Sequence, residues 1–366
     1  MSFRTIAMVC ADKGVAPGSS KGAAQHLRGV AAACHRAGHR VTLFSRRPAE
    51  APFPVPIEPL DQIEHHDTGA PDIVYERYSL GHRRGLEAAR ARGVRFVLEV
   101  NAPLVDEATE HRPETVSESD RTVEAHLIAE ADLVITVSTE LSTWVEALRA
   151  GPTVTIPNGF EPSWFRTTRH TPIEPTLVFL GHPKPWHGAD QLPAILAALA
   201  DLGHRPRLLV AGGGRGADDV MDRARAVGVH EQVTVTGALA PRHATAMLAD
   251  ATIGLAPYPR REPFYFCPLK VVDYLAAGLP VVATDQGDIA NLVRDAGLTV
   301  EPDDVDSFAA AVAALLEDEA TRRSMARAGR RRAHGSMTWD HVAIRTMAAI
   351  DALDATAAGE HVGALR

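Results

Sequence analysis

Lysine is scarce in this chain and stands at four isolated positions. Only four of the 38 basic residues are lysine, namely Lys13, Lys21, Lys184 and Lys270. Each lies near Gly or Pro in a segment that we expect to be a loop. Because arginine serves wherever charge alone is needed, the retained lysines indicate a use for a compact point charge, as in phosphate binding. The alternative is that lysine is simply rare and scattered.

The segment Arg261–Thr284 has the strongest chemical signature in the chain. A proline-bearing loop enters a short helix, which ends at Gly278 before a buried strand. Helix amino termini expose unpaired N–H groups and a partial positive charge, which favour a phosphate. Lys270 in the first turn adds a full charge, and Asp273 one turn later offers a carboxylate suited to paired sugar hydroxyls. The alternative is an ordinary helix with a Lys–Asp pair.

A second loop rich in glycine and proline follows the strand that we expect to end at Gly181. It carries Lys184 and His187 and leads into a helix. A buried diphosphate carries about two negative charges and is costly without cationic partners. Lys184 and Lys270 together would neutralise these charges. The alternative is that His182 and His187 cap an ordinary loop.

The run Leu208–Ala217 matches the G-x-G-x-x-A pattern of dinucleotide-binding turns. Such a turn opens the first βαβ unit of its domain, whereas this one opens the second. No acidic residue ends the next strand, which runs into Thr236-Gly-Ala-Leu239. We therefore do not expect a nicotinamide dinucleotide site here.

Short β-branched runs alternate with amphipathic helical stretches, the pattern of βαβ units with parallel sheets. The elements expected in the first half are strands at Thr5–Cys10, Val41–Phe44, Ile73–Tyr75, Phe96–Val100, Leu133–Val137 and Thr153–Ile156, and a helix over Gly22–Ala37. The strands expected in the second half are Leu177–Leu180, Arg207–Ala211, Val233–Thr236, Thr252–Ala256, Val281–Thr284 and Leu298–Val300. Prolines and turn residues over 157–173 indicate a linker between the halves.

This pattern predicts an α/β protein with two Rossmann-like, doubly wound domains that face a central cleft. We expect an N-terminal domain over 1–157 and a C-terminal domain over 158–337. A terminal helix over 338–353 should cross back to the first domain, before a frayed tail over 354–366. Because ligands of open parallel sheets bind beyond the carboxyl ends of the strands, the lysine-bearing loops should face the cleft.

Composition excludes several classes of protein. The net charge of −8 argues against nucleic-acid binding. Three cysteines without a C-x-x-C pair predict neither a disulfide framework nor a zinc site and favour a reducing cytoplasm. No apolar run approaches the ~20 residues of a membrane span, and the amino terminus is too short for a signal peptide.

Two charged runs do not indicate a functional site. His65-His66-Asp67 lacks further spaced ligands, so we expect no metal site there. The basic run Arg322–Arg332 lacks a large apolar face, so we expect a solvated helix rather than a membrane-binding surface.

The segment 262–284 closely resembles the nucleotide-sugar site of retaining family-4 glycosyltransferases, which have the GT-B fold. That family reads Glu-(seven residues)-Glu-Ala-Met-Ala-x-Gly-x-Pro-Val-Val-Ala, which carries its second glutamate onto Asp273 as the ligand of the ribose hydroxyls. Its first glutamate falls at Tyr265, so the paired acid is missing. Cys267–Tyr274 fits a subset of the family that reads Ser-Pro-Leu-Lys-x-x-Glu-Tyr.

The resemblance extends from Ala37–His39 to the terminal helix and implies roles for residues of both domains. The residues expected to bind the donor are Gly22, Gly181, His187, Gly237, Ala238, Leu239, Cys267, Pro268, Leu269 and Asp273. The residues expected near the acceptor, at the first loop and at polar strand ends, are Lys21, Glu76, Arg77, Glu99 and Asn101. Many family members carry a histidine where Asn101 stands, so no general base is assigned.

The resemblance implies an enzyme that moves a sugar from a nucleoside-diphosphate donor to a soluble small-molecule or saccharide acceptor, with retention of configuration. Lys184 and Lys270 would be its catalytic residues, because they stabilise the leaving diphosphate. We expect no metal, no cofactor besides the donor, no nucleic acid and no stable membrane insertion, and a homo-oligomer is compatible with the sequence. Two alternatives stay open: a nucleotide-sugar epimerase and a non-catalytic nucleotide-sugar binding protein.

Overall fold

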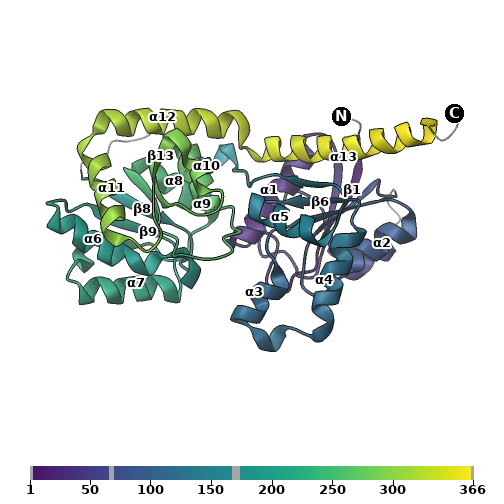
Figure 1. Cartoon of the computed structure of the whole chain (residues 1–366), viewed down its shortest axis with the longest axis horizontal. Helices are drawn as coiled ribbons and strands as arrows, with labels where there is room; N and C mark the ends of the chain where they lie inside the picture. Colours follow the sequence, from purple (N-terminus) through teal and green to yellow (C-terminus); the bar gives the residue numbers. More distant parts are fainter. Residues whose placement is uncertain (1–2, 66–69, 167–173, 364–366) are drawn as a thin grey trace. The chain divides into compact units, whose positions relative to one another are not determined.

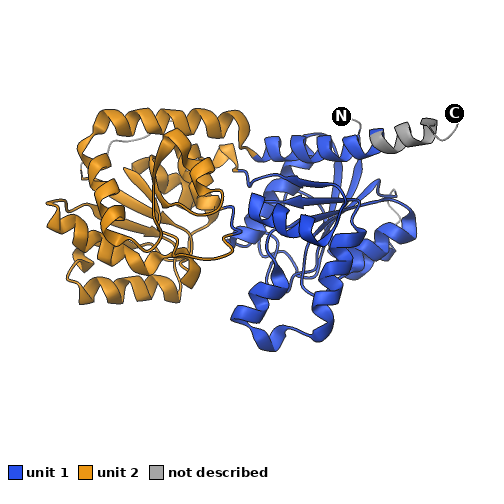
Figure 2. Ribbon diagram, viewed as in Figure 1, with its two compact units in different colours: residues 1–159, 265–267, 339–366 blue, residues 160–264, 268–338 orange. Residues whose placement is uncertain are grey.

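The computed structural model describes residues 3–65, 70–166 and 174–363 (Figure 1). The chain forms two compact units, which Figure 2 shows in blue and orange. Unit 1 comprises residues 1–159, 265–267 and 339–366, and unit 2 comprises residues 160–264 and 268–338. Each unit is built on one parallel sheet flanked by helices, which confirms the predicted pair of Rossmann-like folds.

Unit 1 contains a seven-stranded parallel sheet in the order β3-β2-β1-β4-β5-β6-β7. Its strands are β1 (Thr5–Cys10), β2 (Arg40–Ser45), β3 (Ile57–Pro59), β4 (Ile73–Arg77), β5 (Arg95–Val100), β6 (Leu133–Thr136) and β7 (Thr153–Thr155). Successive strands are added outward from β1, first on one side and then on the other. The topological switch point, where open α/β sheets bind ligands, therefore lies between β1 and β4.

The helices of unit 1 include one formed by the end of the chain. They are α1 (Gly22–Arg36), α2 (Arg84–Arg92), α3 (Leu104–His111), α4 (Glu118–Glu130), α5 (Thr139–Leu148) and α13 (Trp339–Gly363). α1 buries Leu27, Val30 and Cys34, which recur at helical spacing. α13 packs against α1, and Gly29 permits this approach because a Cβ there would lie 2.2 Å from the Trp339 ring.

α13 continues to Gly363, beyond Asp354, where a frayed tail was expected. Arg4 donates to the carboxylates of Asp351 at 2.9 Å and Asp354 at 2.6 Å, and these bonds hold α13 beside β1. The residues after Asp354 are rich in alanine, which has the highest helix propensity.

Unit 2 contains a six-stranded parallel sheet in the order β10-β9-β8-β11-β12-β13. Its strands are β8 (Thr176–Leu180), β9 (Arg207–Ala211), β10 (Val233–Val235), β11 (Ile253–Ala256), β12 (Val281–Thr284) and β13 (Gly297–Val300). Its helices are α6 (Leu192–Asp201), α7 (Arg215–Ala226), α8 (Pro241–Met247), α9 (Leu269–Ala277), α10 (Ile289–Val293), α11 (Val305–Glu317) and α12 (Glu319–Ser336). The switch point of this sheet lies between β8 and β11.

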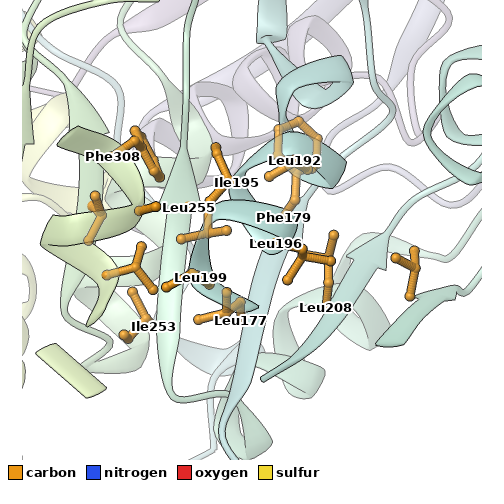
Figure 3. Packing of buried hydrophobic residues seen from close by; sticks show 14 of the residues in the cluster. Leu177, Phe179, Leu192, Ile195, Leu196, Leu199, Leu208, Ile253, Leu255 and Phe308 are labelled. Atoms are coloured by element: carbon orange, nitrogen blue, oxygen red, sulfur yellow. The ribbon is translucent and has the colours of Figure 1, made fainter. Parts of the chain in front are cut away.

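The core of unit 2 lies between the sheet and helices α6, α7 and α11 (Figure 3). Leu177 and Phe179 of β8 are buried there against Leu192 and Ile195 of α6 and Phe308 of α11. This packing fixes β8, so the loop that follows it starts from a rigid strand.

The predicted strands are confirmed to within two residues at each end. β3 was not predicted, because a three-residue strand that ends in proline is too short to show an alternating pattern. Part of the predicted linker, residues 167–173, lies outside the described residues, as do His66 and Asp67.

Candidate functional site

Lys270 lies in the first turn of α9 with its ammonium group buried. Nζ has no hydrogen-bond partner among the described residues, and it lies 3.8 Å from the centroid of the Phe179 ring and 5.1 Å from that of Tyr258. Burial lowers the pKa of Lys270 to about 7. Contact with aromatic faces offsets only part of the cost of burying a cation, so the arrangement favours an anionic ligand.

Tyr274 holds α9 against the sheet. Its hydroxyl oxygen accepts from the backbone N–H of Leu180 at 2.8 Å and lies 3.1 Å from the carbonyl oxygen of Leu255. Gly254 of β11 leaves room for the ring, because a Cβ there would lie 2.5 Å from it. Pro268 precedes the helix, and no acidic side chain stands in its first turn. The amino terminus of α9 therefore keeps its partial positive charge beside the buried ammonium group.

Asp273 lies one turn after Lys270 on α9. Burial raises the pKa of Asp273 to about 8. No described residue forms a hydrogen bond or ion pair with its carboxylate. The pair between Lys270 and Asp273, which was the alternative to a ligand site, therefore does not form. One short helix thus presents a cation suited to phosphate and a carboxylate suited to hydroxyl groups.

His187 is affected by the charges of both lysines predicted to be catalytic. Burial, followed by the charges of Lys270 and Lys184, lowers the pKa of His187 to about 2, so its ring is neutral. Nδ1 lies 3.2 Å from the carbonyl oxygen of His182, which can only accept, so Nδ1 carries the proton and Nε2 keeps its lone pair. Lys184 is exposed at the start of the same short turn. The structure therefore brings both lysines within electrostatic reach of one imidazole.

The glycine run after β9 lets three loops touch through their backbones. A Cβ at Gly212 would lie 2.2 Å from the carbonyl oxygen of Gly181, and a Cβ at Gly213 would lie 2.8 Å from the backbone nitrogen of Ala238. The loops after β8, β9 and β10 are thus packed side by side at one edge of the sheet. This close packing accounts for the glycine pattern without a dinucleotide, and the loop after β9 contacts both the Gly181 turn and Gly237–Ala238.

Glu99 lies inside unit 1 in a buried network of polar groups. His26 Nε2 lies 2.7 Å from Glu99 Oε1, the Tyr75 hydroxyl donates to Oε2, and Arg77 lies 3.5 Å away. Burial would raise the pKa of Glu99, but the charges of His26 and Arg77 and the hydrogen bonds lower it to about 2. Glu99 is therefore an internal counter-ion.

Asn158 extends this network to the segment that precedes α9. Its Oδ1 accepts from His26 Nδ1 at 2.6 Å, and its Nδ2 donates to the carbonyl oxygen of Cys267 at 2.7 Å. Its backbone N–H lies 3.3 Å from Cys267 Sγ. His26 thus faces Asn158 with Nδ1 and Glu99 with Nε2. His26 and Asn158 were not among the predicted site residues, although a histidine on the apolar face of a predicted helix was a signal.

Glu76 and Glu99, which were expected near the acceptor, are both buried, with exposed fractions of 0% and 2%. Glu76 lies under the first turn of α2, where a Cβ at Gly85 would lie 2.2 Å from its Oε2. Burial raises the pKa of Glu76 to about 8 against the opposing effect of the amides of Gly85 and Leu86. Charges at strand ends were expected to be paired or used. Glu99 is paired with His26 and Arg77, whereas both carboxyl oxygens of Glu76 are buried without a hydrogen-bond partner among the described residues.

The other predicted residues of unit 1 lie at the carboxyl edge of its sheet. Lys21 precedes α1 and its Nζ donates to the carbonyl oxygen of Gly14 at 2.8 Å, while Gly22 is the first helical residue. No side chain caps the amino terminus of α1. Asn101 directly follows β5, and its Oδ1 is buried without a hydrogen-bond partner among the described residues.

The described residues contain no group of three or more His, Cys, Asp and Glu side chains arranged to hold a metal ion. None of their helices is both long and apolar enough to cross a membrane.

Two family models match the chain, one on each half. The model described as "Glycosyltransferase Family 4" matches residues 20–164, and the model described as "Glycosyl transferases group 1" matches residues 174–318. Together they span most of both sheets.

Curated relatives are transferases that act on sugars. The chain is 28% identical to glycogen synthase of Mycobacterium tuberculosis over 75% of its own length and 67% of that protein. It is 30% identical to D-inositol 3-phosphate glycosyltransferase of Nocardia farcinica, over 47% of the chain and 39% of that protein. A GDP-mannose-dependent phosphatidylinositol monomannoside mannosyltransferase of M. tuberculosis is 31% identical over 47% of the chain and 46% of its own length.

Solved structures share the fold over nearly the whole chain. Sucrose-phosphate synthase from Thermosynechococcus elongatus has a TM-score of 0.73 at 20% identity, covering 96% of this chain and all of that one. HepE of Anabaena, in complex with UDP and glucose, has a TM-score of 0.71 at 18% identity, covering 95% of this chain and all of that one.

Proposed function

The chain belongs to the group 1 and family 4 glycosyltransferases, and on that premise we propose that it transfers a glycosyl group from a nucleoside-diphosphate sugar to a small-molecule or saccharide acceptor. The transfer retains the anomeric configuration and needs no metal or cofactor besides the donor. We place the reaction in the cytoplasm, which suits the free thiols of Cys10, Cys34 and Cys267.

The observation that carries this proposal is the buried, unpartnered ammonium group of Lys270. A diphosphate at the amino terminus of α9 would supply the missing anion and would accept hydrogen bonds from the N–H groups of the first turn. Lys184 adds a second charge from the loop after β8. Asp273 is proposed to accept hydrogen bonds from the ribose hydroxyls, which would favour its carboxylate form.

The proposed reaction breaks the bond between the anomeric carbon and the diphosphate oxygen while the acceptor oxygen bonds to the same face of that carbon. The bonding electrons leave with the diphosphate, and the acceptor proton passes to one of its oxygens. Negative charge therefore grows on the diphosphate in the transition state, where Lys184, Lys270 and the amides of α9 stabilise it. Because the ring of His187 is neutral, the charges of Lys184 and Lys270 remain available to the diphosphate.

The named activities of the relatives support a nucleotide-sugar donor without selecting its base. One relative is GDP-mannose-dependent, and a structural neighbour was solved with UDP. The acceptors and products in the names of these proteins include saccharides, phosphorylated small molecules and a phosphatidylinositol mannoside. We therefore propose a nucleoside-diphosphate hexose as donor and leave the base to experiment.

A thermal-shift screen of nucleoside diphosphates and their sugars tests the donor. A ligand at ~100 times its Kd adds about 2.7 kcal/mol to the free energy of unfolding. At least one nucleoside diphosphate should raise the Tm of the wild type and not that of Lys270→Met. The proposal fails if none does, or if the variant responds equally.

Release of nucleoside diphosphate from the identified donor separates the rival activities. A transferase releases it faster when an acceptor is added. An epimerase converts the donor sugar without any acceptor, and a binding protein does neither. The orientation of the anomeric bond in the product, read by NMR, decides whether the transfer retains configuration.

A further inference from the structure

Three neighbouring loops at the carboxyl edge of the unit 1 sheet carry basic side chains. Cys10 at the end of β1 is in register with Ser45 at the end of β2 and with Arg77 at the end of β4. The loops that leave these three ends carry Lys13, Arg46 and His82 respectively. Lys13 and His82 therefore stand on the two loops that flank the switch point between β1 and β4. We call Lys13, Arg46 and His82 the Arg46 cluster.

Arg46 and His82 are in direct contact. The guanidinium NH1 of Arg46 lies 2.7 Å from His82 Nε2. Because a guanidinium group has only donors, Nε2 must accept, so the ring is neutral with its proton on Nδ1. Burial and the charges of Arg46, Lys13 and Arg84 lower the pKa of His82, and Asp12 opposes them. Three cations and one carboxylate thus act electrostatically on this ring, and Arg46 contacts it directly.

Lys13 and Arg46 have no carboxylate within ion-pair distance among the described residues, and Asp12 Oδ1 already accepts from the N–H of Gly14 at 2.6 Å. Other arginines at this edge are paired, as in Arg47–Glu50 at 3.6 Å, Arg83–Glu87 at 3.7 Å and Arg84–Glu64 at 3.7 Å. The chain has 46 acidic and 38 basic residues, so carboxylates are not in short supply. Lys13 and Arg46 are thus two exposed cations without a carboxylate partner beside a histidine that is held neutral.

We propose that the Arg46 cluster binds a phosphate monoester carried by the acceptor. The guanidinium fork of Arg46 and the point charge of Lys13 match the two charges of a phosphate dianion, and a carboxylate would leave one of them unmatched. The switch point is where an open sheet of this kind takes its ligand. The assignment of this phosphate to the acceptor rests on the proposed function. The evidence for an anion site comes from unit 1 alone.

A phosphate in this position changes the charge state of His82. Once Arg46 donates to the phosphate, Nε2 is released and can take up a proton, which places a third positive group beside the dianion. Phosphate binding should therefore raise the pKa of His82. By linkage, phosphate should bind more tightly as the pH falls through the range where His82 titrates.

Titration of the intact protein with inorganic phosphate, followed by NMR of the His82 ring nitrogens, tests the site. The His82 pKa should rise on addition of phosphate, and Arg46→Gln or Lys13→Gln should each weaken the binding about tenfold. Arg47→Gln is the matched control, because the neighbouring guanidinium is already paired with Glu50. The site is disproved if phosphate leaves the His82 titration unchanged, or if Arg46→Gln and Arg47→Gln bind equally.

The Lys270→Met variant distinguishes phosphate bound at the Arg46 cluster from phosphate bound at Lys270. This variant should retain the phosphate response of His82. A second arm compares hexoses with their 6-phosphates as acceptors. Arg46→Gln should lower kcat/KM for the phosphorylated acceptor about tenfold and leave the plain hexose unaffected. Equal losses for both acceptors would contradict the assignment to the acceptor. A phosphate response at His82 without any glycosyl transfer would uphold the site and refute the proposed function.

Discussion

The ammonium group of Lys270 is buried against aromatic rings, and burial lowers its pKa from the usual 10.5 to about 7. The unfolded chain therefore binds this proton up to pH 10.5 and the folded chain only up to about pH 7. Between these values the unfolded state holds more protons, so the stability contributed by this group rises with pH. Below pH 7 the folded protein bears the full cost of burying the charge.

Replacement of this lysine by a neutral residue of similar length should separate stability from activity. Lys270→Met should raise the free energy of unfolding at pH 6 by an amount on the order of 1–3 kcal/mol, and the gain should shrink towards pH 10. The same variant should lower turnover by ~100-fold or more. Denaturant titrations at several pH values and steady-state assays measure the two effects.

Lys184→Met is the control for this prediction, because Lys184 is exposed. It should change stability by less than ~0.5 kcal/mol and still reduce turnover. A destabilised Lys270→Met variant would show that the ammonium group has an internal partner.

The segment Tyr265–Cys267 is an element of unit 1, although α9 follows it directly in the chain. Ser138 Oγ donates to the carbonyl oxygen of Tyr265 at 2.8 Å, and the Tyr265 hydroxyl donates to Glu107 at 2.9 Å. Asn158 holds Cys267 through side chain and backbone. Tyr265, which stands where the family has its first glutamate, is thus hydrogen-bonded to Glu107 of α3. These contacts fix the segment that leads directly into the first turn of α9.

Truncation of Asn158 should loosen this element. Asn158→Ala removes the amide between His26 and Cys267 and leaves a buried N–H and a buried carbonyl oxygen without partners, which should cost about 2 kcal/mol or more. The KM for the donor should rise, and hydrogen exchange should accelerate over residues 265–270. Asn291→Ala, at an exposed position of α10, is the control and should change neither. Unchanged exchange at 265–270 would show that Asn158 stabilises unit 1 without positioning α9.

At the scale of the molecule, the two family models and the two sheets correspond. Residues 20–164 fall largely on unit 1, and residues 174–318 fall largely on unit 2. Unit 2 carries the residues proposed for the donor, namely Lys184, His187, Lys270 and Asp273. Unit 1 carries the Arg46 cluster, so each sheet has one anion-binding edge in the proposed enzyme.

Two lysines and a helix terminus should make a divalent cation unnecessary for the transfer. We expect turnover to be unchanged after dialysis against EDTA, because the leaving diphosphate is neutralised by Lys184, Lys270 and the first-turn amides of α9. Steady-state assays with and without EDTA measure this. A loss of activity that Mg²⁺ restores would contradict the proposal that the two lysines and the amides of α9 neutralise the diphosphate.

The sequence by itself determined the order of the elements and the place of the donor loop. Buried strands such as β9 and β12 are short apolar runs bounded by turn residues, and their bounds were predicted without error. Lys270 and Asp273 were identified because a helix start, a cation and a carboxylate occur within a few residues of one another. Local pattern is sufficient for such features, since periodicity and turn chemistry act over short spans of chain.

Only the tertiary structure decided which charges have partners. His26 and Asn158 are 132 positions apart in sequence, and Arg46 and His82 are 36 apart, yet each pair is in contact. Glu99 was expected near the acceptor and is an internal counter-ion, whereas Lys270 was considered for a pair with Asp273 and has none. Burial and ion pairing depend on which distant segments the fold brings together, and no local pattern encodes that.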